Sequence, residues 1–383
     1  MKRNSYLVVS VAFISSIVFL MARMSYKDNV NADTSILSKN KTIPIRELIT
    51  DRPSEIYPKL PYKEFIFPPA NYHSNHASSI VELPDGGLFA VWYAPPKWSP
   101  HSMIWGSRRL PGASEWTKPY VVHYDRGHSD KNPVLYLGTD NKLFLFWATE
   151  KRIWKLVKDE IYMKTSDDFG RTWGKARQIE NLTWFLPKTH LLRLSNGDII
   201  LPIYTDLSTS SAVAISKDGG MTWQGPKYML LFFGIQPTII ERSDKSLFAL
   251  MRTGMPPRLA WQAISPDQGS NWKTRKYSNV DNPGTCLEMI RLNNGHIVLA
   301  SNDDKKNLHE MVLSLSLDEG KTWPYRRVIE YDTQYPNTYP SLMQDRYGLI
   351  HVLYSYNGRE TIAHFVTDED WIKAGDNTVK TIE

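Results

Sequence analysis

Six residues at regular intervals have side chains that could take part in catalysis or binding. Each stands about eight positions before the centre of a short turn, where an apolar run begins. In order they are His76, Asn132, Lys188, Gln236, Cys286 and Tyr339. Five of the six are polar or aromatic, while the residues that follow are apolar. If the six positions are equivalent in a repeated fold, their side chains converge and form a candidate pocket.

Two arginines extend this candidate site. Arg252 ends the apolar run that returns after the turn following Gln236, and Arg258 stands six residues later. An arginine can hold a carboxylate through two parallel hydrogen bonds, so either residue is a candidate for binding an acidic substrate.

Two carboxylates are candidates for proton transfer. Glu288 lies two residues after Cys286, so the alternation of a strand places both on one face. There Glu288 either pairs with Tyr339 of the next repeat or is satisfied by a nearby Arg or Lys. Asp206 is a candidate acid by its position at the end of a strand.

The elements that position these residues form a repeat. A hairpin pattern of hydrophobic strand, polar turn and hydrophobic strand occurs six times, with turn centres 48 to 56 residues apart. The turn centres lie near Asp85, Asp140, Asn196, Asp244, Asn294 and Tyr347.

A second repeated motif, Ser-x-Asp-x-Gly-x-Thr-Trp, marks a tight turn. Its copies are Ser166–Trp173, Ser216–Trp223, Ser265–Trp272 (with Asn271 in place of Thr) and Ser316–Trp323, and a looser relative is Ser107–Trp116. The Asp can accept backbone N–H bonds, Gly permits a positive φ, and Trp covers the hairpin. The motif is therefore predicted to be structural and not catalytic.

Six units of about 50 residues predict an all-β fold, a six-bladed β-propeller with four-stranded blades. A stacked β-sandwich or a solenoid is the alternative. In a propeller the innermost strands line the axis, so their first residues meet at one opening, which we call the mouth. The Asp-containing turns are expected on the opposite face.

The four turn motifs resemble the Asp-boxes, or BNR repeats, of sialidases, and the chain from Tyr72 to His364 is similar to a sialidase-like BNR-repeat domain. This resemblance implies a glycoside hydrolase that acts on acidic glycans. Tyr339, in the sequence YPSL, matches the family's nucleophilic tyrosine. Arg252 or Arg258 would then be the second carboxylate-binding arginine.

The sequence also departs from the family pattern. His76 stands where the family has its first arginine, and Gln236 lies where the glutamate that polarises the tyrosine is expected. Lys306 or His309 would have to replace the third arginine, and the early acid is missing. Two other functions therefore stay open: a non-catalytic glycan-binding propeller, and a uronate-directed polysaccharide lyase on the same scaffold.

The N-terminus carries a targeting signal. Lys2 and Arg3 precede an apolar run from Tyr6 to Ala22. Residues 1–24 are therefore either an uncleaved signal anchor or a cleaved signal peptide. We expect a polar stalk at 25–62, the propeller at 63–375 and a tail at 376–383. The propeller would lie on the non-cytoplasmic side of a membrane, or be secreted if the signal is cleaved.

Composition restricts the other classes of function. Cys286 is the single cysteine, so neither an intrachain disulfide nor a cysteine-based zinc site is possible. The net charge of +6 comes without a dense basic block, which argues against nucleic-acid binding. The spacing of residues indicates no metal site and no cofactor. The expected partner is a glycan or glycoconjugate.

Overall fold

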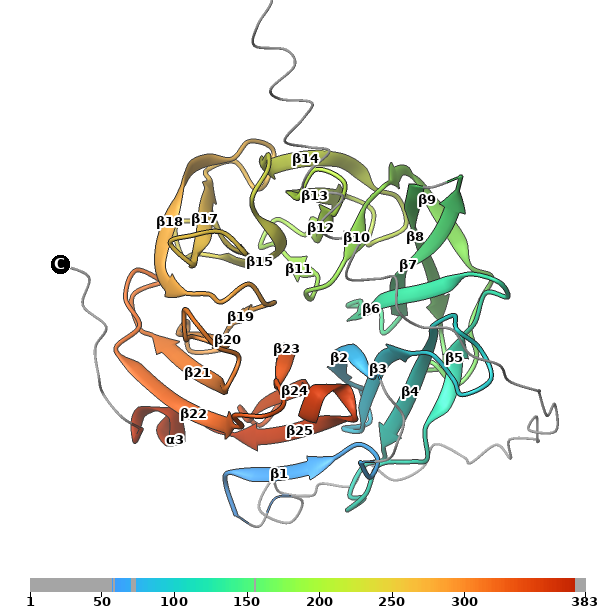
Figure 1. Ribbon diagram of the computed structural model, residues 1–383, viewed down its shortest axis with the longest axis horizontal. Helices are drawn as coiled ribbons and strands as arrows, with labels where there is room; N and C mark the ends of the chain where they lie inside the picture. Colours follow the sequence, from blue (N-terminus) through green and yellow to red (C-terminus); the bar gives the residue numbers. More distant parts are fainter. Residues whose placement is uncertain (1–56, 58, 70–73, 155, 376–383) are drawn as a thin grey trace, which may run out of the picture.

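The computed structural model describes residues 57, 59–69, 74–154 and 156–375. Within these residues the chain forms six antiparallel β-sheets arranged in a ring around a central axis (Figure 1). Each sheet is one blade, with its first strand nearest the axis. The six-bladed propeller expected from the repeats is confirmed, and neither a sandwich nor a solenoid describes the chain.

Blades 1 to 5 each use strands that follow one another in the sequence. Blade 1 contains β2 (His76–Glu82), β3 (Leu88–Ala94), β4 (Met103–Arg109) and β5 (Tyr120–His123), and blade 2 contains β6 (Ser129–Leu137), β7 (Leu143–Ile153), β8 (Leu156–Ser166) and β9 (Arg177–Thr183). Blade 3 contains β10 (Leu186–Pro187), β11 (Leu192–Arg193), β12 (Ile199–Thr205), β13 (Ser210–Ser216) and β14 (Gln224–Leu230). Blade 4 contains β15 (Ile235–Glu241), β16 (Leu247–Arg252), β17 (Leu259–Ser265) and β18 (Lys273–Asp281), and blade 5 contains β19 (Glu288–Arg291), β20 (Ile297–Ser301), β21 (Glu310–Ser316) and β22 (Tyr325–Tyr331).

Blade 6 is built from two distant parts of the sequence. Its inner strands are β23 (Thr338–Gln344), β24 (Ile350–Tyr356) and β25 (Thr361–Thr367), with the short 3-10 turn η1 (Asn357–Arg359) before β25. Its outer strand is β1 (Tyr62–Phe65), which pairs with β25 at the edge of the ring (Figure 1). Helix α3 (Glu369–Lys373) follows, and its Trp371 packs on Phe365. The ring is therefore closed by a strand from the N-terminal side of the sequence.

A single carboxylate joins the closing strand to its own blade and to blade 1. Oε1 of Glu64, on β1, accepts hydrogen bonds from Arg109 of blade 1 at 2.9 Å and from the indole of Trp116 at 2.9 Å. The same oxygen lies 2.8 Å from Nδ1 of His364 in blade 6. Trp116 belongs to the looser relative of the turn motif, so this tryptophan serves ring closure.

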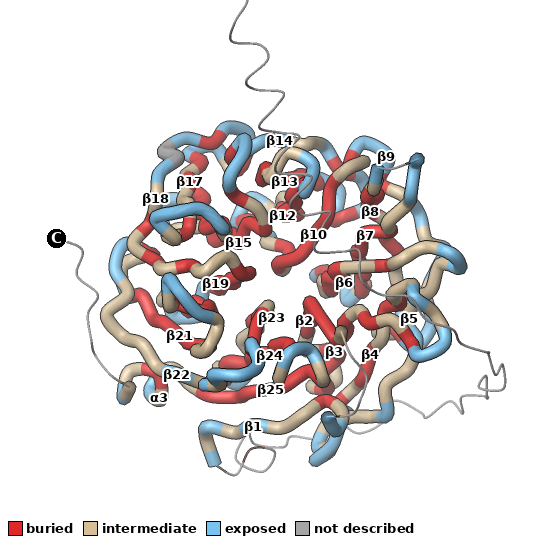
Figure 2. Tube along the Cα trace, viewed as in Figure 1, coloured by how far each residue is buried: buried red, intermediate tan, exposed pale blue. Residues whose placement is uncertain are grey.

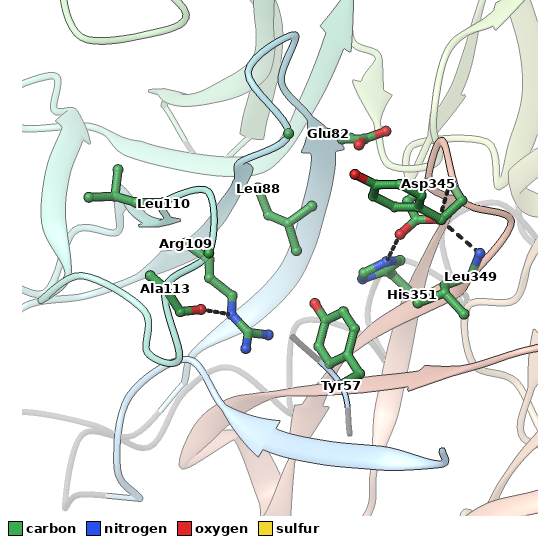
Figure 3. A pocket seen from close by; sticks show the side chains of 12 residues that line it. Tyr57, Glu82, Leu88, Arg109, Leu110, Ala113, Asp345, Leu349 and His351 are labelled. Carbon is green, nitrogen blue, oxygen red and sulfur yellow. Dashed lines mark hydrogen bonds and ion pairs between the residues drawn. The ribbon is translucent and has the colours of Figure 1, made fainter. Parts of the chain in front are cut away.

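Tyr57, which precedes β1 in the sequence, packs at the junction between blades 6 and 1. Figure 3 shows it between Arg109 and His351, at the small pocket where blades 6 and 1 meet. The Arg109 guanidinium lies 4.7 Å from the centre of the Tyr57 ring, and the His351 ring lies 5.9 Å from it. Tyr57 is also buried against Leu349 and Val366.

The predicted segments at the two ends of the chain are only partly tested. Residues 1–24 and 376–383 lie outside the described residues, and none of the described helices is long and apolar enough to cross a membrane. The end of the predicted stalk needs a correction. Tyr57 and Tyr62 belong to the propeller, because their aromatic rings pack on blade 6.

Apolar packing between blades forms the core, and Figure 2 shows the buried strands around the axis with exposed segments outside. The tryptophans of the turn motifs contribute to this packing. The ring centre of Trp173 in blade 2 lies 6.5 Å from that of Phe89 in blade 1. The ring of Trp223 in blade 3 packs edge-on against Phe146 of blade 2, with ring centres 5.5 Å apart. Each motif thus fastens its own blade to the preceding one.

The turn motifs have the structure expected from their sequence. In the second copy, Oδ1 of Asp218 accepts the Thr222 backbone N–H at 2.8 Å, and Oδ2 accepts the Thr222 hydroxyl at 2.5 Å. In the third copy, Nδ2 of Asn271 donates to Asp267 at 2.6 Å. The asparagine therefore supplies the same hydrogen bond as the threonine.

The stability of the fold depends on pH through the carboxyl group of Asp218. Burial alone would raise the pKa of its carboxyl, but the hydrogen bonds from Thr222 outweigh burial and hold the pKa below its usual value. Because the pKa of this carboxyl is lower in the folded state than in the unfolded state, where it is about 4, the ionised group stabilises the fold. This stabilisation is fully present above the unfolded pKa and is lost as the pH falls through the lower, folded pKa.

We expect Asp218→Asn to lower the free energy of unfolding by roughly 1 kcal/mol at neutral pH, because the charged acceptor is lost from an exposed turn. The deficit should shrink between pH 6 and pH 3, as measured by urea denaturation across that range. Glu115→Gln, at another exposed site, is the control. A deficit that is independent of pH would contradict this account.

Candidate active site at the propeller mouth

Three side chains reach the mouth because their inner strands carry the same irregularity. The first strands of blades 2, 4 and 6 have β-bulges at Asn132-Pro133, Gln236-Pro237 and Tyr339-Pro340. In each pair the first residue has a left-handed φ, of 49°, 55° and 60° respectively. Proline has no N–H to give to a strand ladder, so a bulge suits it. The bulge re-aims the preceding side chain, which is a local cause for the cluster described next.

Tyr339 lies at the centre of this cluster. Its hydroxyl oxygen accepts a hydrogen bond from Nη1 of Arg252 at 2.7 Å and from Nε2 of Gln236 at 3.2 Å. The same Arg252 nitrogen donates to Oε1 of Gln236 at 3.0 Å. Blades 4 and 6 are thereby joined across the axis.

Tyr204 extends the network to blades 2 and 3. Its hydroxyl accepts from Nδ2 of Asn132 at 2.9 Å and from Nε2 of Gln236 at 3.3 Å. Burial is the main cause that raises the pKa of Tyr204 well above its usual value, so this phenol stays protonated. Tyr204 was not among the predicted site residues.

The orientation of the Gln236 amide follows from its neighbours. Arginine can only donate, so the Gln236 atom that faces Arg252 must be the carbonyl oxygen. The amide nitrogen then donates to both phenols. The Tyr339 oxygen accepts two hydrogen bonds, which use both of its acceptor positions. Its own O–H points away from these donors and can donate a hydrogen bond to a bound molecule.

Arg252 has hydrogen-bonding capacity to spare. Burial lowers the pKa of its guanidinium, but the nearby Tyr339, Cys286 and Tyr204 raise it, and the net change is upward. No described residue accepts a hydrogen bond from its Nε or Nη2. This edge of the guanidinium can therefore receive a carboxylate.

His76 lies against Tyr339 but not in the position expected for it. Its ring centre is 3.9 Å from that of Tyr339, and its Nδ1 is 2.9 Å from the Ser355 hydroxyl. The bulge of blade 1, however, places Ala77 (φ 50°) at the position equivalent to Tyr339. His76 stands nine residues before its turn centre, one more than in the other blades, so Ala77 and not His76 completes the equivalent set.

His76 is a neutral imidazole. Burial is the largest cause that holds its pKa well below the usual value, and the positive charges of Arg359, Lys188 and Arg252 add to the effect. Its Nε2 is buried and makes no hydrogen bond to any described residue. A neutral ring with an unoccupied nitrogen can exchange a proton with a neighbouring group.

Lys188 crosses the channel. It comes from blade 3, and its Nζ donates to the Pro340 carbonyl of blade 6 at 3.4 Å. The ammonium also lies 5.8 Å from the centre of the Tyr339 ring, and only 2% of the residue is exposed. Its charge therefore acts inside the site and not at its surface.

Glu288 has a different partner from the tyrosine. Its Oε1 accepts the His190 backbone N–H at 2.9 Å and lies 2.7 Å from Nδ1 of that imidazole, while Oε2 is buried and meets no described donor. The hypothesis that Glu288 pairs with Tyr339 is wrong for this structure. One oxygen of the carboxylate is satisfied nearby, as the alternative proposed, but by a histidine.

The remaining candidates lie at the edge of the site. Arg258 donates to the Pro283 carbonyl at 2.8 Å and does not join the Tyr339 network. Asp206 lies on the exposed turn after β12, where its charge contributes to the raised pKa of Tyr204. Burial raises the pKa of the Cys286 thiol, so it stays protonated and is not a ready nucleophile.

Comparisons with known proteins agree with this geometry. A family model for the BNR repeat-like domain matches residues 86–352. No curated protein matches the sequence. The leech intramolecular trans-sialidase is 14% identical, with a TM-score of 0.67 over 82% of this chain and 71% of its own. The NanB sialidase of Streptococcus pneumoniae is 13% identical, with a TM-score of 0.66 over 81% and 71%. An α-L-arabinanase of Penicillium chrysogenum is 15% identical, with a TM-score of 0.61 over 82% and 100%.

The fold and these likenesses define the chain as a sialidase-like six-bladed β-propeller. It belongs to the BNR repeat-like domain family, as the turn motifs indicated. At these identities the structural likenesses concern the fold. Among the residues that the structure describes, no cluster of three or more His, Cys, Asp or Glu side chains could hold a metal ion.

We expect Tyr204→Phe to lower the free energy of unfolding by about 1–3 kcal/mol, because two buried amide donors, from Asn132 and Gln236, lose their shared acceptor. Chemical denaturation measures the change. Tyr228→Phe, at an exposed tyrosine of the same blade, is the matched control. Equal stability of the two variants would show that the Tyr204 hydroxyl does not hold the network together.

Proposed function

We propose that the protein is a glycoside hydrolase that acts on acidic glycans, with Tyr339 as the reacting group and Arg252 as the carboxylate-binding residue. The observation that carries this proposal is the pair of hydrogen bonds that the Tyr339 oxygen accepts from Arg252 and Gln236. Both donors favour negative charge on that oxygen, and the arginine also offers a free edge to a carboxylate.

The reaction would proceed in two steps. The Tyr339 oxygen attacks the anomeric carbon, the glycosidic bond breaks, and the leaving oxygen takes a proton. Water then cleaves the tyrosyl–sugar bond and restores the phenol. A phenol suits a substrate whose own carboxylate would repel an attacking Asp or Glu.

Proton transfer would use residues other than the usual carboxylate. Gln236 and the engaged Glu288 are unsuited to the role of base for Tyr339. His76, whose ring packs against that of Tyr339, is the candidate acceptor of the phenol proton, but burial lowers its pKa and makes it a weak base. Asp206, exposed at the mouth, is the candidate acid for the leaving oxygen. Asp303, which follows β20 as Asp206 follows β12, is a less suitable acid because Arg326 binds it through two hydrogen bonds.

One observation favours a lyase as the second candidate. His76 and Tyr339 form an adjacent neutral imidazole and phenol without a carboxylate. Such a pair could remove the proton next to the carboxylate of a uronate unit, while Arg252 and Gln236 hold that carboxylate. The bond to the neighbouring sugar would break by elimination, leaving a double bond in the product.

We expect Tyr339→Phe to reduce turnover of the acidic glycan at least about a hundredfold, because the reacting oxygen is removed while the ring stays packed. The assay follows a fluorogenic sialoside and a polyuronate in parallel. Release of the fluorophore identifies the hydrolase, and new ultraviolet absorbance from an unsaturated uronide identifies the lyase.

Tyr335→Phe, at an exposed tyrosine, is the control and should keep wild-type turnover. Saturable glycan binding by the wild-type chain without either product would refute both enzymes and leave a binding propeller.

Arg252→Lys should raise KM for acidic substrates roughly tenfold to a hundredfold, because lysine keeps the charge but cannot present two parallel donors. Steady-state kinetics on an acidic glycan and on its methyl ester measure the effect. The ester has lost the carboxylate charge, so the variant and the wild type should differ little on it. An equal loss on both substrates would mean that Arg252 does not recognise the carboxylate.

A further inference from the structure

Aromatic side chains are exposed on the face of the propeller that holds the mouth. The register pairs His76 with Tyr93 and Ile235 with Arg252, so the loops after the second and fourth strands of each blade lie at the Tyr339 end. These loops and hairpin tips carry five exposed aromatics, which we call the aromatic rim: Trp98, Trp154, Phe232, Phe233 and Tyr335. The exposed fractions run from 43% for Trp98 to 98% for Trp154.

Three members of the rim are held in an unfavourable backbone conformation. Trp154, Phe232 and Phe233 have φ values of 59°, 66° and 70°, which bulky residues rarely adopt. Hydrogen bonds fix the two phenylalanines, because their backbone N–H groups donate to the Ser210 and Thr209 hydroxyls at 3.1 Å and 3.2 Å. Trp154 stands in the tight hairpin turn between the paired residues Ile153 and Leu156, where a positive φ is ordinary, whereas the two phenylalanines lie in a longer loop. Strain at exposed apolar rings in such a loop points to a binding surface there.

Two members of the aromatic rim, Phe232 and Phe233, adjoin the candidate site. Phe233 stands three residues before Gln236, and the intervening Ile235 packs with Tyr204 and Leu186. A molecule bound at Tyr339 that extends over the boundary of blades 3 and 4 would therefore pass the two phenylalanines.

The exposed charges of the same loops are mostly positive. Among their described residues, six exposed cations accompany a single exposed acid, Asp206; the cations are Lys97, Arg126, Arg152, Lys305 (which also pairs with Asp281 at 3.5 Å), Lys306 and Arg359. Other acidic residues of these loops are half-buried and accept hydrogen bonds from backbone N–H groups of the same loops. Asp304 accepts the Lys306 backbone N–H at 2.8 Å, and Asp332 accepts that of Gln334 at 2.7 Å. The face thus presents positive charge around a mouth that is itself cationic.

We propose that the aromatic rim and its cations are an extended subsite for a linear glycan that carries a carboxylate on successive sugar units. The proposal rests on the proposed function, because it extends the same site. Aromatic rings offer flat apolar faces to the C–H faces of sugar rings, and the scattered cations attract a chain of regularly spaced negative charges.

An anionic membrane would also attract aromatic and basic residues, but a glycan is favoured by the position of the aromatic rim. The strained phenylalanines adjoin a polar, carboxylate-binding mouth, which suits a chain that enters that mouth. Two half-buried basic residues of the hairpin that carries Trp154 are engaged: Lys151 and Lys158 both pair with Glu160. The hairpin tip that would enter a membrane is therefore partly neutralised.

The test measures binding and not turnover, with the full chain carrying Tyr339→Phe. Calorimetry compares the Kd for polygalacturonate, expressed per chain, with that for the galacturonate trimer and monomer at low and moderate salt. We expect the polymer to bind at least about tenfold tighter than the monomer, with an affinity that falls as salt rises. Phe232→Ser/Phe233→Ser and Arg126→Gln/Arg152→Gln should each remove most of this advantage and leave monomer binding unchanged.

Matched controls lie on the opposite face. Met221→Ser/Leu317→Ser removes exposed apolar side chains there, and Lys245→Gln/Lys321→Gln removes exposed charges. These variants should bind the polymer as the parent does. The proposal is overturned if the rim variants also keep the parent's affinity, if the controls lose as much, or if the rim residues are needed for anionic phospholipid vesicles but not for polygalacturonate.

Failure of the proposed function has a separate signature. If the wild-type chain cleaves no acidic glycan while the rim variants still lose polymer binding, the proposed function fails and the subsite stands. If cleavage occurs but polymer and monomer bind equally well, the subsite fails and the proposed function stands.

Discussion

Closure of the ring through Glu64 is the constraint on which every other feature of the molecule depends. One carboxylate oxygen collects three contacts, from Arg109 and Trp116 on one side and from His364 on the other. Removing charges and polar groups from water is costly unless each finds a partner, so this junction tolerates few substitutions. Once the ring is closed, inner strands that are distant in the sequence face one another. Only then do Arg252 and Tyr339, from blades 4 and 6, come within hydrogen-bonding distance.

The arrangement of side chains at the mouth depends in turn on the β-bulges of the inner strands. A regular strand would alternate its side chains across the blade, and each would pack against a neighbouring blade. The X-Pro bulge with a left-handed first residue breaks this alternation at Asn132, Gln236 and Tyr339. Gln236 then orders the site, because its carbonyl faces Arg252 and its amide faces the two phenols. The chemistry of the mouth is thus set by backbone geometry as much as by residue type.

The sequence was a good guide to the fold because its signals are local and repeated. Turn motifs such as Asp218 with Thr222 report a structure made within a few residues, and the six hairpin patterns give the number of blades. The convergence of Arg252 and Tyr339 followed from that symmetry. The partner of Glu288 could not be predicted in this way. Strand alternation shows on which face of the strand a residue lies, but not which residue of another blade it contacts. Tyr204 was missed although it ends a strand at the mouth, and the Asn-Pro, Gln-Pro and Tyr-Pro pairs were an unused signal for the bulges.

The placement of β1 has a consequence for how the chain is made. Its residues leave the ribosome before all six inner strands, yet their partner, β25, is synthesised about 300 residues later. Each of blades 1 to 5 can assemble from neighbouring segments as it emerges, whereas the last sheet must recapture a segment from the far end of the polypeptide. During translation the growing arc therefore keeps an open seam, and the mouth acquires its final arrangement only when synthesis has passed Thr367.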